Sequence, residues 1–200
     1  MAAPIRFYLD FASPSAYCAA DRVGQLGEEF GRKVEWQPIL MWAVLKAHGI
    51  APPMEPPAKR AYFLNDMQRS ADFFGLPYQH PVRLPLSSHL AARLYHHVFQ
   101  SRPETADALA RRLLTAFFAE FRDISDEGTL VGLAGEVGIP DDEAREGMKG
   151  AAGRALLEKA VQDAISAGVV GSPYFLVDGE GFFGADRLPQ LRWFLAGGGR

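Results

Sequence analysis

The stretch YLDFASPSAY, residues 8–17, decides the fold of this chain. Apolar residues alternate up to Phe11, which predicts a strand, and recur at helical spacing beyond Tyr17, which predicts a helix. At the junction, Ser13 is a favoured N-cap residue and Pro14 suits the first helical turn. Free backbone N–H groups and the positive end of the helix dipole therefore meet beside a serine hydroxyl. Such a site can hold an anion, including a thiolate; the simpler alternative is that Ser13 only caps the helix.

The composition is that of an ordinary globular protein. Of 200 residues, 48% are hydrophobic and 22% are charged, and the net charge of -3 disfavours a nucleic-acid-binding surface. No apolar run reaches membrane-spanning length, and the N-terminus lacks the pattern of a secretory signal. The single cysteine, Cys18, excludes an internal disulfide and any CxxC pair. We therefore expect a cytoplasmic protein that binds neither nucleic acid nor membrane.

A second alternating segment, residues 33–40, follows the first helix. Strand, helix and strand in this order form a βαβ unit, which is normally parallel and right-handed. From Met41 to Gly168 the strong signals are helical, apart from a proline-rich loop at 51–57 and an irregular segment at 77–85. The helices predicted in this block cover residues 41–48, 59–74, 86–99, 102–119, 129–137, 141–149 and 153–167.

Strand signals return at Pro173–Val177, and Asp178-Gly179 is a hairpin-type turn before a strand at 181–183. A helix at 187–195 closes the pattern. A ββα segment cannot bury a core by itself, so it must return to the first βαβ unit. The predicted fold is therefore α/β, with a four-stranded mixed sheet and a large all-helical insertion. The two predicted domains comprise residues 1–40 plus 169–200 and residues 41–168.

Four motifs follow one another along the chain: DFASPSAY (10–17), PP (52–53) with Lys59 and Tyr62, GVVGSP (168–173), and DGE followed by FGADRL (178–188). Their order resembles that of the thioredoxin fold, and the helical insertion resembles its DsbA-like branch. Within that branch, the chain is similar to 2-hydroxychromene-2-carboxylate isomerases and kappa-class glutathione transferases. The resemblance implies a thioredoxin-like domain built from both ends of the chain, glutathione as cofactor, and a homodimer.

The resemblance also assigns roles around the first motif. In thioredoxin-type oxidoreductases, the positions of Ser13 and Ala16 are the two cysteines, so this chain cannot cycle a disulfide there. Ser13 is instead implied to donate a hydrogen bond to the glutathione sulfur, whose pKa the helix end lowers. Ser172-Pro173 resembles the cis-proline loop of the fold. A cis bond there would turn the N–H and C=O of Ser172 outward to pair with the cysteine unit of glutathione.

The remaining implied contacts concern the two ends of glutathione. Ala185 and Asp186 are implied to hold the γ-glutamyl end, with Asp186 facing its ammonium; the alternative is that Asp186 is an N-cap. Lys59 is implied to lie near the glycine carboxylate or the acidic substrate; the alternative is a solvated lysine. The chain departs from the family pattern at Ile50, where the kappa pattern has asparagine, and at the helix opening Leu86-Ser87-Ser88, where many relatives have an asparagine. The second substrate's pocket is therefore poorly constrained.

Other reactive or aromatic residues have a structural interpretation. Cys18 is expected to be a small buried residue. His89, His96 and His97 share a helix without an i,i+4 pair, so no metal site is expected. Phe11, Trp42, Phe63 and Tyr95 are possible pocket walls, although we expect them to pack in the core.

The leading hypothesis is a glutathione-dependent isomerase of the 2-hydroxychromene-2-carboxylate type, which adds glutathione thiolate reversibly to a small aromatic carboxylate. One alternative is a kappa-type glutathione transferase that releases a conjugate. Another is a non-catalytic thioredoxin-like module that binds an extended peptide at Ser172-Pro173.

Overall fold

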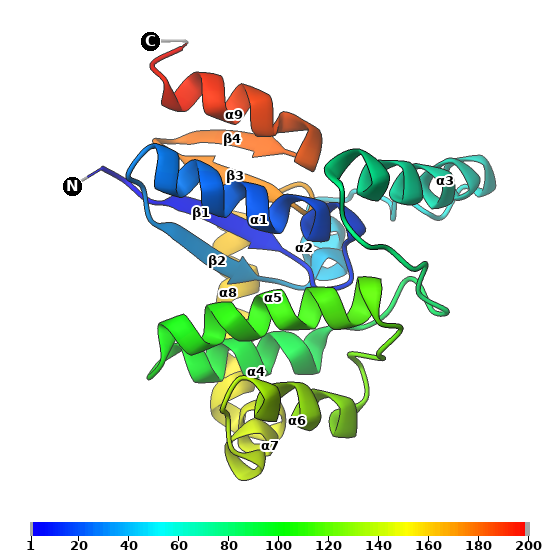
Figure 1. Ribbon diagram of the computed structural model, residues 1–200, viewed down its shortest axis with the longest axis vertical. Helices are drawn as coiled ribbons and strands as arrows, with labels where there is room; N and C mark the ends of the chain where they lie inside the picture. Colours follow the sequence, from blue (N-terminus) through cyan, green and yellow to red (C-terminus); the bar gives the residue numbers. More distant parts are fainter. Residues whose placement is uncertain (1, 199–200) are drawn as a thin grey trace.

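The structure, a computed structural model that describes residues 2–198, is organised around a four-stranded mixed sheet (Figure 1). The strands are β1 (Ile5–Leu9), β2 (Val34–Pro38), β3 (Tyr174–Val177) and β4 (Glu180–Phe183). They lie in the order β2-β1-β3-β4, with β1 parallel to β2 and antiparallel to β3, and β3 antiparallel to β4. The predicted α/β fold with a mixed sheet is therefore confirmed.

Strands from opposite ends of the chain meet through their aromatic residues. Phe7 on β1 is paired with Trp36 on β2 and with Phe175 on β3. Its ring stacks on that of Phe175, with centroids 5.4 Å apart, and meets that of Trp36 edge-on at 5.0 Å. All three side chains are buried, so their contacts fix the register of the central strands.

The helices follow the predicted order, and most begin or end within three residues of the predicted bounds. They are α1 (Pro14–Glu29), α2 (Met41–Ala47), α3 (Pro57–Phe74), α4 (His89–Phe99), α5 (Pro103–Ala119), α6 (Glu127–Glu136), α7 (Asp141–Lys149), α8 (Ala151–Ser166), a 3-10 turn (Ala185–Arg187) and α9 (Leu188–Leu195). α1 lies in front of the sheet and α9 beside β4, α8 passes behind, and α4 to α7 form a block below (Figure 1). No helix among residues 2–198 is both long enough and apolar enough to cross a bilayer.

Helix α3 differs from its prediction. Its sequence predicts an apolar face with Tyr62, Phe63, Met67 and Phe74, yet Ala71 is its only buried residue and Tyr62 is 58% exposed. The reason is its position: α3 extends sideways from the body (Figure 1) and packs mainly against α1. Helical periodicity predicts an apolar face but not whether another element covers it.

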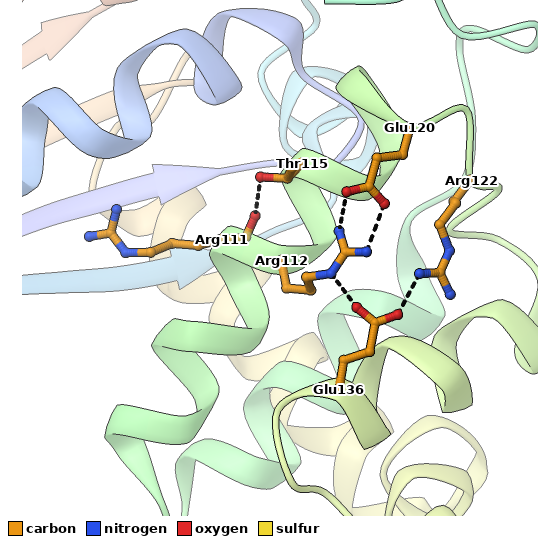
Figure 2. Close-up of polar contacts among 6 residues, drawn as sticks. All are labelled: Arg111, Arg112, Thr115, Glu120, Arg122 and Glu136. Carbon is orange, nitrogen blue, oxygen red and sulfur yellow. Dashed lines mark hydrogen bonds and ion pairs between the residues drawn. The ribbon is translucent and has the colours of Figure 1, made fainter. Parts of the chain in front are cut away.

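An ion-pair network joins the middle of α5, the turn that follows it and the end of α6 (Figure 2). Arg112 donates to both carboxylate oxygens of Glu120 and also pairs with Glu136, which in turn accepts from Arg122 at 2.6 Å. Phe121 lies between Glu120, which pairs with Arg112, and Arg122, which pairs with Glu136. Its φ of 56° is in the left-handed region. The network therefore holds the chain reversal that ends α5.

The end of α5 supports the segment that leads into α4. The Phe118 ring stacks on Tyr17 from α1 and on Tyr78 from the connecting loop, with centroids 5.4 and 6.1 Å apart. The Phe118 carbonyl accepts from the N–H of Gln79 at 2.7 Å, and the Tyr17 hydroxyl donates to the carbonyl of Pro77 at 2.7 Å. The irregular loop is thus tied to both α1 and α5 before the chain enters α4.

Candidate functional site

The site is built where β1 passes into α1. Ser13 is the N-cap of α1, with extended φ and ψ of -95° and 111°, and Pro14 occupies the first helical turn. The Ser13 hydroxyl oxygen accepts from the N–H of Ala16 at 3.3 Å, and its carbonyl accepts from the same N–H at 3.1 Å. The predicted cap is confirmed, and the positive end of α1 lies beside the hydroxyl.

The loop before β3 lies against this cap. The Ser172–Pro173 peptide bond is cis, as predicted. The Ser13 hydroxyl donates to the carbonyl of Ser172 at 2.9 Å, and the N–H of Asp10 donates to the Ser172 hydroxyl at 2.8 Å. The carbonyl of Ser172 therefore faces Ser13 and accepts a hydrogen bond from it. Because Ser13 carries one hydroxyl proton, it cannot donate to Ser172 and to a sulfur at the same time.

Ala185 also belongs to this group. The carbonyl of Pro173 accepts from the N–H of Gly184 at 3.0 Å, and the N–H of Ala185 donates to the Ser15 hydroxyl at 3.4 Å. Gly184 has φ and ψ of 106° and 151°, a conformation that essentially only glycine adopts. This glycine brings the buried Ala185 against the first turn of α1, next to the serine cap.

Asp186 follows Ala185 in the 3-10 turn, and its side chain is 72% exposed. Its carboxylate lies 3.5 Å from Arg187 and does not cap a helix, since the N-cap of α9 is Arg187. The alternative interpretation of Asp186 as an N-cap is therefore wrong. Asp186 lies within a short 3-10 turn that precedes α9, which the sequence pattern did not predict.

Lys59 is not joined to the other predicted site residues. It lies exposed in the first turn of α3, and within residues 2–198 no hydrogen bond or ion pair connects it to Ser13, Ser172 or Asp186. The structure thus brings together Ser13, Ser172, Pro173 and Ala185 at one end of the sheet. Asp186 follows Ala185 but is exposed, and in the described part of the chain no hydrogen bond or ion pair joins it to the other three, while Lys59 lies on a separate helix.

Asp10 is the polar residue that the sequence interpretation missed. It directly follows β1 and is 7% exposed. Its carboxylate accepts from the N–H of Ala12 at 2.9 Å, the N–H of Met41 at 2.8 Å and the hydroxyl of Ser88 at 2.6 Å. Burial raises the pKa of Asp10 from its usual range, and these hydrogen bonds oppose the rise. The sequence feature that could have identified Asp10 is an acidic residue directly after an apolar strand.

The remaining candidates are mostly structural. Cys18 is buried as predicted, and burial raises the pKa of its thiol to about 11, so it is a poor source of thiolate. Phe11 and Tyr95 lie in the core as expected, whereas Trp42 is exposed. The buried His96 ring bonds the Pro38 carbonyl at 2.7 Å. Residues 2–198 contain no cluster of three or more His, Cys, Asp or Glu side chains able to hold a metal ion.

Residues 4–196 match the family model of the DsbA-like thioredoxin domain. The chain belongs to the DsbA-like thioredoxin family. This DsbA-like chain is 29% identical, over 98% of its length, to the 2-hydroxychromene-2-carboxylate isomerase of Sphingobium xenophagum and covers 99% of that protein. It is 25% identical to glutathione S-transferase kappa 2 of Caenorhabditis elegans, with coverage of 96% and 91%. A solved 2-hydroxychromene-2-carboxylate isomerase matches with a TM-score of 0.84 and 24% identity, over 96% of this chain and 94% of that one, which supports the fold.

Proposed function

We propose that the protein is a glutathione-dependent isomerase of the 2-hydroxychromene-2-carboxylate type. The observation that carries the proposal is the serine hydroxyl at the N-terminus of α1, beside a cis-proline loop and without a cysteine at either redox position. The similarity to an isomerase and to a kappa-class transferase supports an enzyme that uses a thiol. A cytoplasmic location and a homodimer belong to the same proposal through the resemblance to these families.

The donors at the site fit an anionic sulfur carried by a peptide. Ser13 offers a hydroxyl that can rotate from Ser172 toward a ligand, and the N–H of Ser15 has no hydrogen-bond partner within residues 2–198. The N–H of Ser172, on the cis-proline loop, is likewise without a partner in that range and suits the cysteine unit of glutathione. The site therefore combines donors for a thiolate with a main-chain donor for the peptide that bears it.

Each predicted residue then has a role in holding glutathione and its substrate. When bound, glutathione supplies a thiolate that adds reversibly to a conjugated position of an aromatic acid. Ser13 and the end of α1 stabilise the sulfur anion and lower the pKa of the thiol. Ser172 and Pro173 hold the peptide, Ala185 and Asp186 hold the γ-glutamyl end, and Lys59 attracts the glycine carboxylate or the aromatic acid.

The test is a set of progress curves with a chromene carboxylic acid and less than one equivalent of glutathione. An isomerase should convert all of the substrate, because glutathione is released in each cycle. If turnover stops after one equivalent of glutathione, the protein is a transferase, which the similarity to a kappa-class enzyme makes the second candidate. Conversion that needs no glutathione would overturn both, and glutathione binding without conversion of any aromatic acid in a panel would favour the peptide-binding module.

A further inference from the structure

The three hydrogen bonds to the Asp10 carboxylate come from three separate segments of the chain. Ala12 belongs to the loop that enters α1, Met41 is the first residue of α2, and Ser88 is the N-cap of α4. All three groups donate, and the carboxylate accepts them with both oxygens. One buried carboxylate therefore links the starts of three helices, two of which belong to the predicted helical insertion.

The Ser88 hydroxyl bonds Asp10 in place of the hydrogen bond that would stabilise its own helix. Serine at an N-cap usually accepts from the backbone of the next turn, which is worth about 1 kcal/mol. Ser88 makes no such bond, and its hydroxyl donates to Asp10 at 2.6 Å instead. α2 is similar, because its N-cap Leu40 has no polar side chain and the first N–H of the helix donates to Asp10.

The main chain of Asp10 holds the other side of the site. Its carbonyl accepts from the N–H of Ser13 at 2.9 Å, and its N–H donates to the hydroxyl of Ser172 at 2.8 Å. Asp10 thus contacts both members of the Ser13–Ser172 pair through its backbone, while its side chain contacts the starts of α2 and α4. A displacement of this carboxylate would be transmitted to the hydroxyl at the N-terminus of α1.

We propose that Asp10 is the positioning residue of this site, holding Ser13 and Ser172 in the geometry that serves a bound thiolate. The inference rests on the proposed function, because it concerns the glutathione sulfur. The environment requires a carboxylate rather than an amide. With three donors directed at it, an asparagine would place its own N–H₂ group against one of them and leave a buried polar group unpaired.

The direction in which Asp10→Asn shifts the pKa of bound glutathione distinguishes a positioning role from a purely electrostatic one. Asp10→Asn removes a negative charge, which by itself lowers the pKa of a nearby thiol. Loss of positioning acts in the opposite direction, because a displaced Ser13 stabilises the thiolate less. We therefore expect Asp10→Asn to raise the pKa of bound glutathione by about one unit, a tenfold change in ionisation, as measured by thiolate absorbance during a pH titration.

A pair of serine variants tests the same role while Asp10 itself stays in place. Ser88→Ala removes one donor to Asp10 and touches neither Ser13 nor Ser172. Ser87→Ala is the matched control, because the exposed Ser87 hydroxyl bonds the His89 ring rather than Asp10. Ser88→Ala should raise the pKa of bound glutathione and lower kcat about threefold to tenfold with little change in the KM for glutathione. Ser87→Ala should change neither.

The outcomes distinguish this inference from the proposed function. If the unmodified protein forms no bound thiolate, both the proposed function and the positioning role of Asp10 are overturned. If the unmodified protein forms the thiolate, but Asp10→Asn lowers the thiol pKa and Ser88→Ala behaves as Ser87→Ala, only the positioning role is overturned. A fall in melting temperature with unchanged thiol pKa and kcat would mark Asp10 as purely structural.

Discussion

Ser13 and Lys59 are both predicted to contact glutathione, but the structure holds Ser13 by several hydrogen bonds and places Lys59 on a largely exposed helix. Ser13 is bonded to its near neighbours Asp10 and Ala16 and, 159 positions further along the chain, to Ser172. Lys59 lies on α3, an 18-residue helix in which Ala71 alone is buried. The junction of β1 and α1 is therefore set by many mutually supporting bonds, whereas α3 is set mainly by its contact with α1.

This difference indicates how the two regions contribute to catalysis. A group that stabilises a developing anion must be fixed before the reaction, since reorganisation costs rate. A group that only attracts a carboxylate from the surface tolerates movement, because an exposed ion pair contributes little. We therefore expect changes at the β1–α1 junction to alter the rate, and changes on α3 to alter affinity weakly.

Ser13→Ala should have the largest effect. Loss of a single donor to a bound anion lowers the rate by about 10²–10³, whereas loss of the cap costs about 1 kcal/mol. Isomerase assays together with thermal unfolding measure both quantities, and Ser13→Thr, which keeps a hydroxyl, is the control. Nearly full activity in a folded Ser13→Ala variant would show that the serine is only a helix cap.

Asp186→Asn should have an intermediate effect. The carboxylate is exposed and its one close ion pair is with Arg187 at 3.5 Å, so its removal should barely change the melting temperature. If it faces the ammonium of glutathione, Kd should rise about tenfold, the loss of one charge-assisted hydrogen bond. Calorimetric titration measures the affinity. Glu180→Gln, at the far end of β4, is the matched control, and equal affinities in both variants would contradict the assigned contact.

The sequence predicts the features that depend on neighbouring residues. The alternation of β1, the Ser13 cap and the order of the helices all follow from local patterns. The cis bond before Pro173 and the grouping with Ala185 came from resemblance to a family. Together these cover the sheet and much of the candidate site.

The features that the sequence did not predict depend on distant partners. The carboxylate of Asp10 is bonded by residues 31 and 78 positions away, and a local pattern carries no record of such contacts. The Ser172 carbonyl faces Ser13 across 159 positions. For α3, periodicity shows which residues share a face, but burial depends on whether another element packs there, as Tyr62 demonstrates.

Lys59→Ala should have a small effect. An exposed lysine that attracts a carboxylate contributes about 0.2–1 kcal/mol, so the KM for glutathione or for the aromatic acid should rise about two- to fivefold with kcat unchanged. Arg60→Ala removes the adjacent exposed cation from the same turn of α3 and is the control. If the two variants behave alike, the helix acts through its general charge and Lys59 has no specific contact. Kinetics at two salt concentrations measure how much of either effect is electrostatic, because salt screens exposed charges.

Phe73→Ser should have almost no effect on stability, and its neighbour provides the contrast. Phe73 is 81% exposed, so its replacement should change the free energy of unfolding by less than about 0.5 kcal/mol. Phe74 packs against the core, and the guanidinium of Arg22 lies 5.1 Å from its ring centroid, so Phe74→Ser should cost about 1–3 kcal/mol. Chemical denaturation measures both values. Equal losses, with a melting temperature that rises with protein concentration, would show that a second copy of the chain covers Phe73 in solution. The exposed face of α3 would then belong to the expected homodimer, and its apolar residues would be explained by that contact.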